Sequence, residues 1–545
     1  MDESAKRHIN DLPFELLQEI LVCAAFLVDE HPTPSFMGQR YDDLDPARAS
    51  SQAVWNWLDV MAVCKLWRTA ANESPQFHSR VALQNAFAMR RSLALSHGVP
   101  LRIISGRVQS WMEFKMVGLE EALGGVLPRV CEIDLVASPD AFGVVQAVMI
   151  TILSNPAPLL RRLRARYLPG VDGPALIDAE QYEPSDRPLR DLTLTGLQFS
   201  KRTSFFPPSL RSLSLTQCHL FEDAGAQTLC DLLGSLPDLE VIDFRDTVLA
   251  DLAEPIRVSL PTHPTHLQRL RRLTLDAPYM TVHRFLGLIT FPTTTSVELS
   301  LQSVTSALLT LGPPDALLGF LKRHVGAASE SGSGYTRVGT HLDVSPYHGE
   351  LSYAWTFSRP HNADDTAVLP GSMTVKWTFS VKRHYEFPVM AGYVKFVIEL
   401  IPHANVPHTL HVLQSGSFAR WRREGEELNE YDCWFTPYEV GLESTVELWF
   451  AGGAILDALY WFANNQRCGG WSGRSDYPTL KVLGFRNPSM YLDESLIGER
   501  DGQIEGVVRR HPGKNYAVKF WNCEVPDQLR REMVEVFGCN LEIIQ

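Results

Sequence analysis

The sequence has few basic residues for its length. Its 545 residues include 50 Lys and Arg against 63 Asp and Glu, which gives a net charge of -13. Proteins that bind nucleic acid non-specifically need a basic surface. The net charge therefore argues against nucleic acid as a partner, although it does not exclude a local basic patch.

Long apolar runs and paired cysteines are also missing. The longest apolar run, near Phe142–Leu153, is shorter than the roughly 20 residues that cross a bilayer, and no signal-peptide core follows the polar start MDESAKRH. None of the nine cysteines has Cys-x-x-Cys spacing, so neither a zinc module nor a thioredoxin-like site is predicted. We expect no membrane partner and a location in the cytoplasm or nucleus.

Catalytic motifs are missing as well. The segment GVVRRHPGKN has Val508 where a phosphate-binding loop needs its first glycine, and the sequence contains no Gly-x-Ser-x-Gly or His-Glu-x-x-His. His403, His408 and His411 do not have a common zinc-ligand spacing. We expect a non-enzymatic chain with no catalytic residue, no cofactor and no metal.

Two amphipathic helices are predicted near the N-terminus. The first covers Leu12 to about Ala25, and the second carries apolar residues at helical spacing from Trp57 to Ala71. A segment at about 28–51 contains prolines, Gly38 and mixed charges, which predicts an inserted loop.

The stretches LPFELLQEIL and VCKLWRTAANESPQF resemble an F-box, apart from the inserted loop. The residues that match in type and order are Leu12, Pro13, Glu15, Leu16, Leu17, Ile20, Leu21, Val63, Cys64, Trp67, Arg68 and Pro75. The resemblance implies binding to the Skp-family adaptor of an SCF ubiquitin ligase, and through it to the cullin and RING subunits. It implies an adaptor-binding set of Leu12, Pro13, Leu16, Leu17 and Ile20, with Val63, Cys64 and Trp67 in the interface or in the F-box core. The alternative is an ordinary helical hairpin.

The rest of the chain repeats a Leu-x-x-Leu-x-Leu pattern. Segments of this type start at Val130, Leu160, Leu189, Leu210, Leu239 and Leu270, and further candidates lie near Val297 and Leu480. A period of 20–30 residues with this signature is typical of leucine-rich repeats. The alternative is a non-solenoid α/β domain with similar buried strands.

The predicted fold class is therefore α/β (or α+β): a helical F-box followed by an irregular leucine-rich solenoid with parallel strands on its concave face. The predicted ranges are an F-box at 1–82, connector helices at 83–126, a solenoid at 127–326, an irregular β-rich region with insertions at 327–476, and C-terminal repeats with a cap at 477–545. The region at 327–476 either continues the solenoid or forms a separate β-rich domain. Strands are expected near Met373, Tyr393 and Ser444, and the segment PDQLRREMVEVFG is expected to form a capping helix.

The predicted function is the substrate-recognition subunit of an SCF-type ligase, similar to fungal F-box proteins with leucine-rich repeats, with an unknown protein as substrate. A non-catalytic scaffold is the alternative, and a small-ligand receptor is a weaker third possibility. Arginines recur at the second and third repeat positions: Arg161, Arg162, Arg190, Arg211, Arg271 and Arg272. Their face would bind an acidic or phosphorylated segment, or they would pair with Asp191, Asp243 and Asp276. The candidate substrate face is Arg190, Thr193, Arg211, Ser214, Asp243, Arg245, Arg271, Arg272 and Asp276.

Overall fold

A computed structural model shows a mixed α/β protein with two compact units, Met1–Arg269 and Leu270–Gln545. The description below covers residues 9, 12–30, 60–83, 86–108, 125–137, 142–167, 175–177, 188–199, 206–220, 226–249, 264–304, 317, 319–320, 323, 337–345, 350–358, 373–380, 408–414, 445–452, 481–486, 517–521 and 541–544. Each unit is described by itself.

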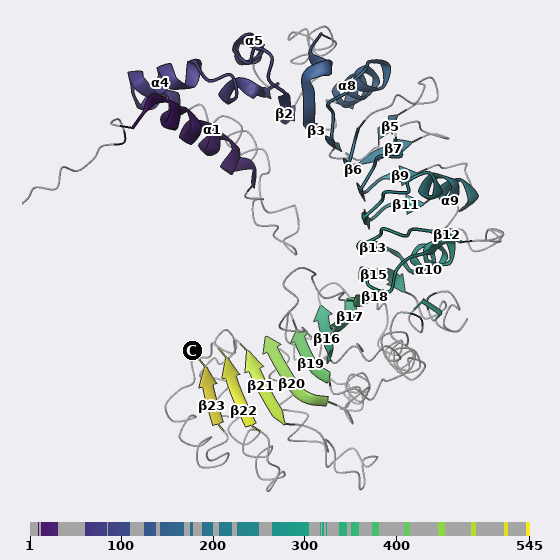
Figure 1. The fold of residues 1–545 in the computed structure, drawn as a ribbon. Helices are drawn as coiled ribbons and strands as arrows, with labels where there is room; N and C mark the ends of the chain where they lie inside the picture. The colour runs from purple at the N-terminus through teal and green to yellow at the C-terminus, as the bar shows by residue number, and fades with distance from the viewer. Residues whose placement is uncertain are drawn as a thin grey trace, which may run out of the picture. The chain divides into compact units, whose positions relative to one another are not determined.

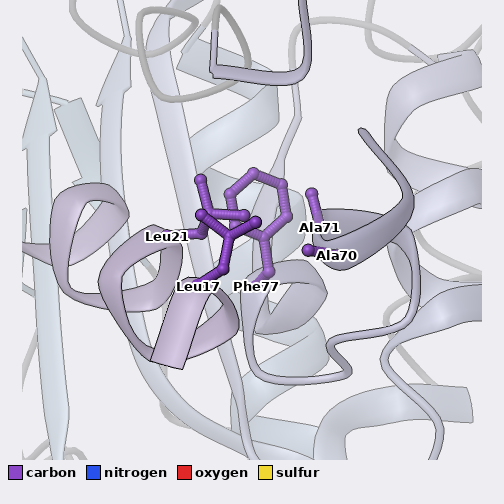
Figure 2. Close-up of a cluster of buried hydrophobic side chains, with 5 residues drawn as sticks. All are labelled: Leu17, Leu21, Ala70, Ala71 and Phe77. Carbon is purple, nitrogen blue, oxygen red and sulfur yellow. The ribbon is translucent and has the colours of Figure 1, made fainter. Parts of the chain in front are cut away.

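The first unit begins with helices. Helix α1 (Phe14–Glu30) packs against α4 (Lys65–Asn72) and the 3-10 helix η3 (Phe77–Ser79), and α3 (Val60–Val63) precedes α4. Their shared core, shown in Figure 2, consists of Leu17, Leu21, Ala70, Ala71 and Phe77. Apolar side chains at helical spacing face this core, as the sequence pattern predicts.

Two details of these helices differ from the sequence-based prediction. α1 continues to Glu30, past the predicted start of the inserted loop at residue 28. The second predicted helix is two helices, because the backbone of Cys64 is extended and its sulfur accepts a hydrogen bond from the Trp67 N–H at 3.5 Å. Cys64 therefore caps α4, and a cap residue is non-helical by its nature.

His78 lies buried beside this core. Desolvation, with a further contribution from the Arg91 charge, lowers the pKa of His78 to about 4 from 6.5. Its ring also makes an edge contact with Phe77, with 5.4 Å between ring centroids. His78 is therefore neutral in the folded chain at neutral pH.

This burial predicts acid sensitivity. Below pH 6.5 the unfolded chain binds a proton at His78 that the folded chain binds only near pH 4, so the free energy of unfolding falls as the pH falls through this window. Between pH 7 and pH 5 the loss from His78 should be about 2 kcal/mol. Urea denaturation at both pH values should show this loss reduced in His78→Gln and unchanged in His266→Gln, which alters an exposed histidine that does not act on the His78 pKa. An equal loss in wild type and His78→Gln would contradict it.

A parallel sheet forms the body of the first unit (Figure 1). Its strands pair in chain order: β1 (Arg80–Ala82), β2 (Leu101–Val108), β3 (Val130–Ala137), β4 (Arg162–Tyr167), β6 (Asp191–Thr195), β8 (Ser212–Thr216) and β10 (Val241–Arg245). The helical elements between them are α5 (Ala86–Leu95), η4 (Leu127–Arg129), α8 (Phe142–Ser154) and α9 (Ala226–Gly234). The sheet starts earlier than predicted, since β1 and β2 lie in ranges assigned to the F-box and to connector helices.

Each strand of the repeat buries its fourth and sixth positions, as predicted. The register places Leu163, Leu192, Leu213 and Ile242 side by side, and each is fully buried. A second buried row contains Leu135, Ala165, Leu194, Leu215 and Phe244. Side chains alternate between the faces of a strand, so the intervening residues lie on the other face.

A repeated turn follows three of these strands. Gly196, Gln217 and Asp246 occupy equivalent positions and have φ values of 69°, 51° and 48°, in the left-handed region. The turn leads into β7 (Leu197–Phe199), β9 (His219–Leu220) and β11 (Val248–Leu249), which form a second parallel sheet together with β5 (Ala175–Ile177). Short β12 (Thr265–His266) packs against α9.

Side chains just after this turn donate hydrogen bonds to carbonyls of the preceding strand of the sheet. The Cys218 S–H donates to the Leu194 carbonyl at 3.4 Å, and the Thr247 hydroxyl donates to the Leu215 carbonyl at 3.0 Å. Burial raises the pKa of the Cys218 thiol to about 11, which keeps it a donor. These side chains satisfy buried carbonyls of the neighbouring strands β6 and β8.

The second unit contains a larger mixed sheet. Its spatial order is β13 (Arg272–Pro278), β15 (Ser296–Val304), β18 (Met373–Ser380), β17 (Glu350–Ser358), β16 (Arg337–Ser345), β19 (His408–Gln414), β20 (Thr445–Gly452), β21 (Val482–Arg486), β22 (Ala517–Trp521) and β23 (Leu541–Ile544). α10 (Tyr279–Leu288) packs against β13 and β15, and β14 (Ile289–Thr290) follows it.

Strand order in this unit departs from a simple repeat. The predicted strands at Met373 and Ser444 are confirmed as β18 and β20. However, β16, β17 and β18 form an antiparallel meander, so β15 pairs with β18 and not with the next strand in the chain. The predicted strand near Tyr393 and the predicted capping helix lie outside the described residues.

Gly484 on β21 has no space for a side chain. It lies opposite Trp449 of β20, and a Cβ atom there would overlap the Trp449 ring. Gly484→Ala should therefore displace the indole and lower the free energy of unfolding by about 1–3 kcal/mol. Gly98→Ala is the matched control, because no atom lies within 4 Å of a Cβ at that position. Equal urea midpoints for the two variants would contradict this prediction.

Candidate functional site

Exposed apolar side chains concentrate on the N-terminal helices. The large hydrophobic residues that are exposed in the described part of the chain are Ile9, Leu16, Ile20, Val63, Leu66 and Leu159, and all but Leu159 precede residue 67. Leu16 and Ile20 are 46% and 39% exposed and lie one turn apart on α1. Contiguous apolar exposure of this kind marks sites of protein–protein interaction.

The predicted adaptor-binding residues separate into three groups. Leu16, Ile20, Val63 and Pro13 are exposed, whereas Leu12, Cys64 and Trp67 are partly buried. Leu17 is fully buried in the core between α1 and α4, so its side chain belongs to the chain's own core and not to the surface. Leu66, within the VCKLW stretch, is exposed and was absent from the predicted set.

A second site is a pocket where strands β2, β3, β4 and β6 begin. The cavity has a volume of about 450 Å³. Its lining consists of Pro100, Arg102, Cys131, Glu132, Leu159, Arg161, Arg162, Arg190 and Asp191. Four arginines against two carboxylates leave two excess positive charges in the lining, although the whole chain is acidic.

One row of the pocket neutralises its own charge. The strand register aligns Arg102, Glu132, Arg162 and Asp191. Ion pairs join them in sequence: Arg102–Glu132 at 3.6 Å, Arg162–Glu132 at 3.2 Å and Arg162–Asp191 at 3.6 Å. Burial lowers the pKa of the Arg162 guanidinium, but Glu132 and Asp191 raise it by more, and the net direction is upward.

The neighbouring column carries charges of one sign. It consists of the second residues of three successive repeats, Arg161, Arg190 and Arg211. Their backbones are hydrogen-bonded: the Arg190 N–H donates to the Arg161 carbonyl and the Arg211 N–H donates to the Arg190 carbonyl, both at 2.8 Å. Arg211 pairs with Glu240 at 3.6 Å. Arg161 and Arg190 are exposed, and neither makes an ion pair with a residue that the structure describes.

The residues of the predicted substrate face are divided between the two units. Arg190, Thr193, Arg211, Ser214, Asp243 and Arg245 lie at the sheet of the first unit, whereas Arg271, Arg272 and Asp276 belong to the second. Arg245 pairs with Asp243 at 2.8 Å, and Asp276 accepts a hydrogen bond from Gln302 at 2.7 Å. Of the predicted internal pairs, the one between Arg162 and Asp191 is present, whereas Asp243 pairs instead with Arg245. Arg161 and Arg190 make no ion pair with a described residue.

The sequence pattern indicated the arginines but not the pocket. Arg102, Glu132 and Leu159 were not predicted as site residues, and Arg102 lies before the first recognised repeat. What brings these residues together is the register of the parallel strands. Each lies close to the start of a strand, and the starts of neighbouring strands are aligned in the sheet.

Comparisons with known proteins add no relative. No protein-family model, no curated protein and no solved structure matches the chain. Among the described residues, no group of three or more His, Cys, Asp or Glu side chains is arranged to hold a metal ion. In the same residues, every helix is too short or too polar to cross a membrane.

Proposed function

We propose that the chain is the substrate-recognition subunit of an SCF-type cullin–RING ubiquitin ligase. The observation that carries the proposal is the split within the Leu-Pro-initiated helix α1. Leu17 and Leu21 pack inside the chain, while Leu16 and Ile20 remain exposed. A helix with one face used internally and another apolar face left exposed has the amphipathic pattern of a docking helix.

The proposed fold assignments are an F-box for the N-terminal helices and leucine-rich repeats for the sheet that follows. The repeat consensus continues Leu-x-x-Leu-x-Leu-x-x-Asn/Cys-x-Leu. Leu210 to Leu220 follows it, with Cys218 at the Asn/Cys position, and Thr247 stands at the same position of the next repeat. The hydrogen bonds from Cys218 and Thr247 to carbonyls of the preceding repeat's strand support this assignment.

The proposed mechanism is proximity. The chain would bind the Skp-family adaptor through its helices and a protein client through the sheet, in the cytoplasm or nucleus. Cullin, RING subunit and conjugating enzyme would supply the chemistry. Holding a client lysine near the charged conjugating enzyme raises its effective concentration.

Reconstitution tests the proposal. The full chain should co-purify with a co-expressed Skp-family adaptor, recruit cullin and RING subunit, and support ubiquitin transfer to a client captured from cell extract. Capture of the adaptor without cullin or client modification would indicate a scaffold. Failure to bind any Skp-family adaptor would reject the proposal.

A further inference from the structure

The arginine-lined pocket carries an inference about the client. We infer that Arg161 and Arg190 bind a phosphorylated side chain of a client protein in the cavity at the start of β2, β3, β4 and β6. That the phosphorylated molecule is a client of a ubiquitin ligase rests on the proposed function. The anion site itself rests on the geometry of the first unit.

The first step is the charge column. Neighbouring strands lie about 4.8 Å apart, so Arg161, Arg190 and Arg211 stand one strand spacing apart. Like charges directly opposite on adjacent strands are destabilising. The adjoining row alternates in sign and is ion-paired throughout, which shows that this sheet has a way to avoid such repulsion. Arg161 and Arg190 have no such oppositely charged neighbour in their column. An anion bound between them would remove the repulsion.

The second step is the chemistry of the anion. Glu132 and Asp191 would repel an anion, but their charges are already compensated by Arg102 and Arg162. A phosphate monoester carries about -1.5 to -2 charges and three acceptor oxygens, which matches the two excess positive charges of the lining. Guanidinium groups bind phosphate bidentately, so two of them can hold one phosphate from two sides.

The third step is the wall around the charge. Leu159, the one exposed large hydrophobic residue of the described part beyond the N-terminal helices, lines the same cavity together with Pro100. A cavity of about 450 Å³ lies within the range of pockets that enclose more than a single ion. The apolar wall indicates that a phosphate is presented with neighbouring atoms of a peptide, and not as a free ion.

The test uses the full chain and degenerate peptide libraries. A library with one fixed phosphoserine is compared with the same library carrying serine or glutamate at that position. Wild type should retain the phosphoserine library at least about tenfold over the serine library, since one charge-assisted contact corresponds to a factor of that order. Arg161→Ala/Arg190→Ala should reduce this ratio to within about twofold.

Arg164→Ala/Arg269→Ala is the matched control. It removes two exposed arginines of the first unit that pair with Asp134 and Asp238 outside the pocket, and it should keep the preference. Thermal melts should show Arg161→Ala/Arg190→Ala at least as stable as wild type, because removing like charges relieves repulsion. A lost preference in a destabilised variant would therefore count against the charge-column argument.

Three outcomes would overturn the inference. They are equal retention of phosphoserine and serine libraries, a preference that survives in Arg161→Ala/Arg190→Ala, and displacement of the peptides by inorganic phosphate at equal concentration, which indicates a small-anion site. None of these measurements contains the adaptor. A chain that selects phosphopeptides but binds no adaptor would reject the proposed function and retain the site.

Discussion

Replacing Leu16 and Ile20 together by alanine should abolish binding of the Skp-family adaptor while the chain stays folded. Both side chains are exposed on α1 and lie outside the buried core cluster that Leu17 and Leu21 form with α4, so their truncation leaves that core intact. Apolar anchors at the centre of an interface cost about 2–4 kcal/mol each when truncated. The expected loss of affinity is therefore about 4 kcal/mol or more, roughly 1,000-fold, measured by calorimetric titration of the purified chain with adaptor.

The matched control is Glu15→Ala/Glu19→Ala. These exposed carboxylates have the same one-turn spacing on the same helix, and their removal should change adaptor affinity only a few-fold. Circular dichroism should show equal helix content in both double variants. Undiminished adaptor binding by the Leu16/Ile20 variant would remove the proposed docking surface and the F-box assignment with it.

Leu213→Ala should strongly destabilise the first unit. Leu213 is fully buried in the middle of a row between Leu192 and Ile242, and atoms on both sides lose contacts when it is truncated. Leucine-to-alanine changes in well-packed cores cost about 3–5 kcal/mol. Urea denaturation should show this loss.

Ser214→Ala is the control for the buried row. Ser214 neighbours Leu213 on the same strand but points to the opposite, partly exposed face, so its replacement should change the free energy of unfolding by less than about 0.5 kcal/mol. Similar urea midpoints for the two variants would mean that this sheet does not bury the repeat leucines as described.

The two candidate sites lie on different elements and should bind their partners independently. The exposed residues of α1 lie within the helical segment, whereas the arginine column lies at the sheet. Variants at one site should leave the binding partner of the other unaffected, because residues without shared contacts act additively. A combined Leu16/Ile20 and Arg161/Arg190 variant should therefore lose both activities and gain no further defect.

Local patterns determined much of the secondary structure. The Leu-x-x-Leu-x-Leu segments predicted buried strands at Leu163, Leu192 and Leu213 because side chains alternate along a strand, and this period is visible in one segment alone. The helical spacing of Leu16, Leu17 and Leu21 likewise predicted an amphipathic α1. Such features depend only on neighbours in the chain.

Tertiary structure decided which of these residues meet. Both Leu16 and Leu17 belong to the apolar stripe of α1, and only packing against α4 makes Leu17 internal and leaves Leu16 exposed. The antiparallel strand β17 separates β18 from β16, which no local period records. Pairing partners are chosen by the whole fold, because a strand's own sequence specifies its faces and not its neighbour.

The candidate anion site shows the same division. The sequence by itself determined that arginines recur at the second and third repeat positions. Only the parallel register decided that Arg162 lies between Glu132 and Asp191 and is neutralised, while Arg161 lies beside Arg190 and is not. The physical reason is distance: these residues are about 30 positions apart in the chain, but one strand spacing of about 4.8 Å apart in the sheet, where charges act on one another strongly.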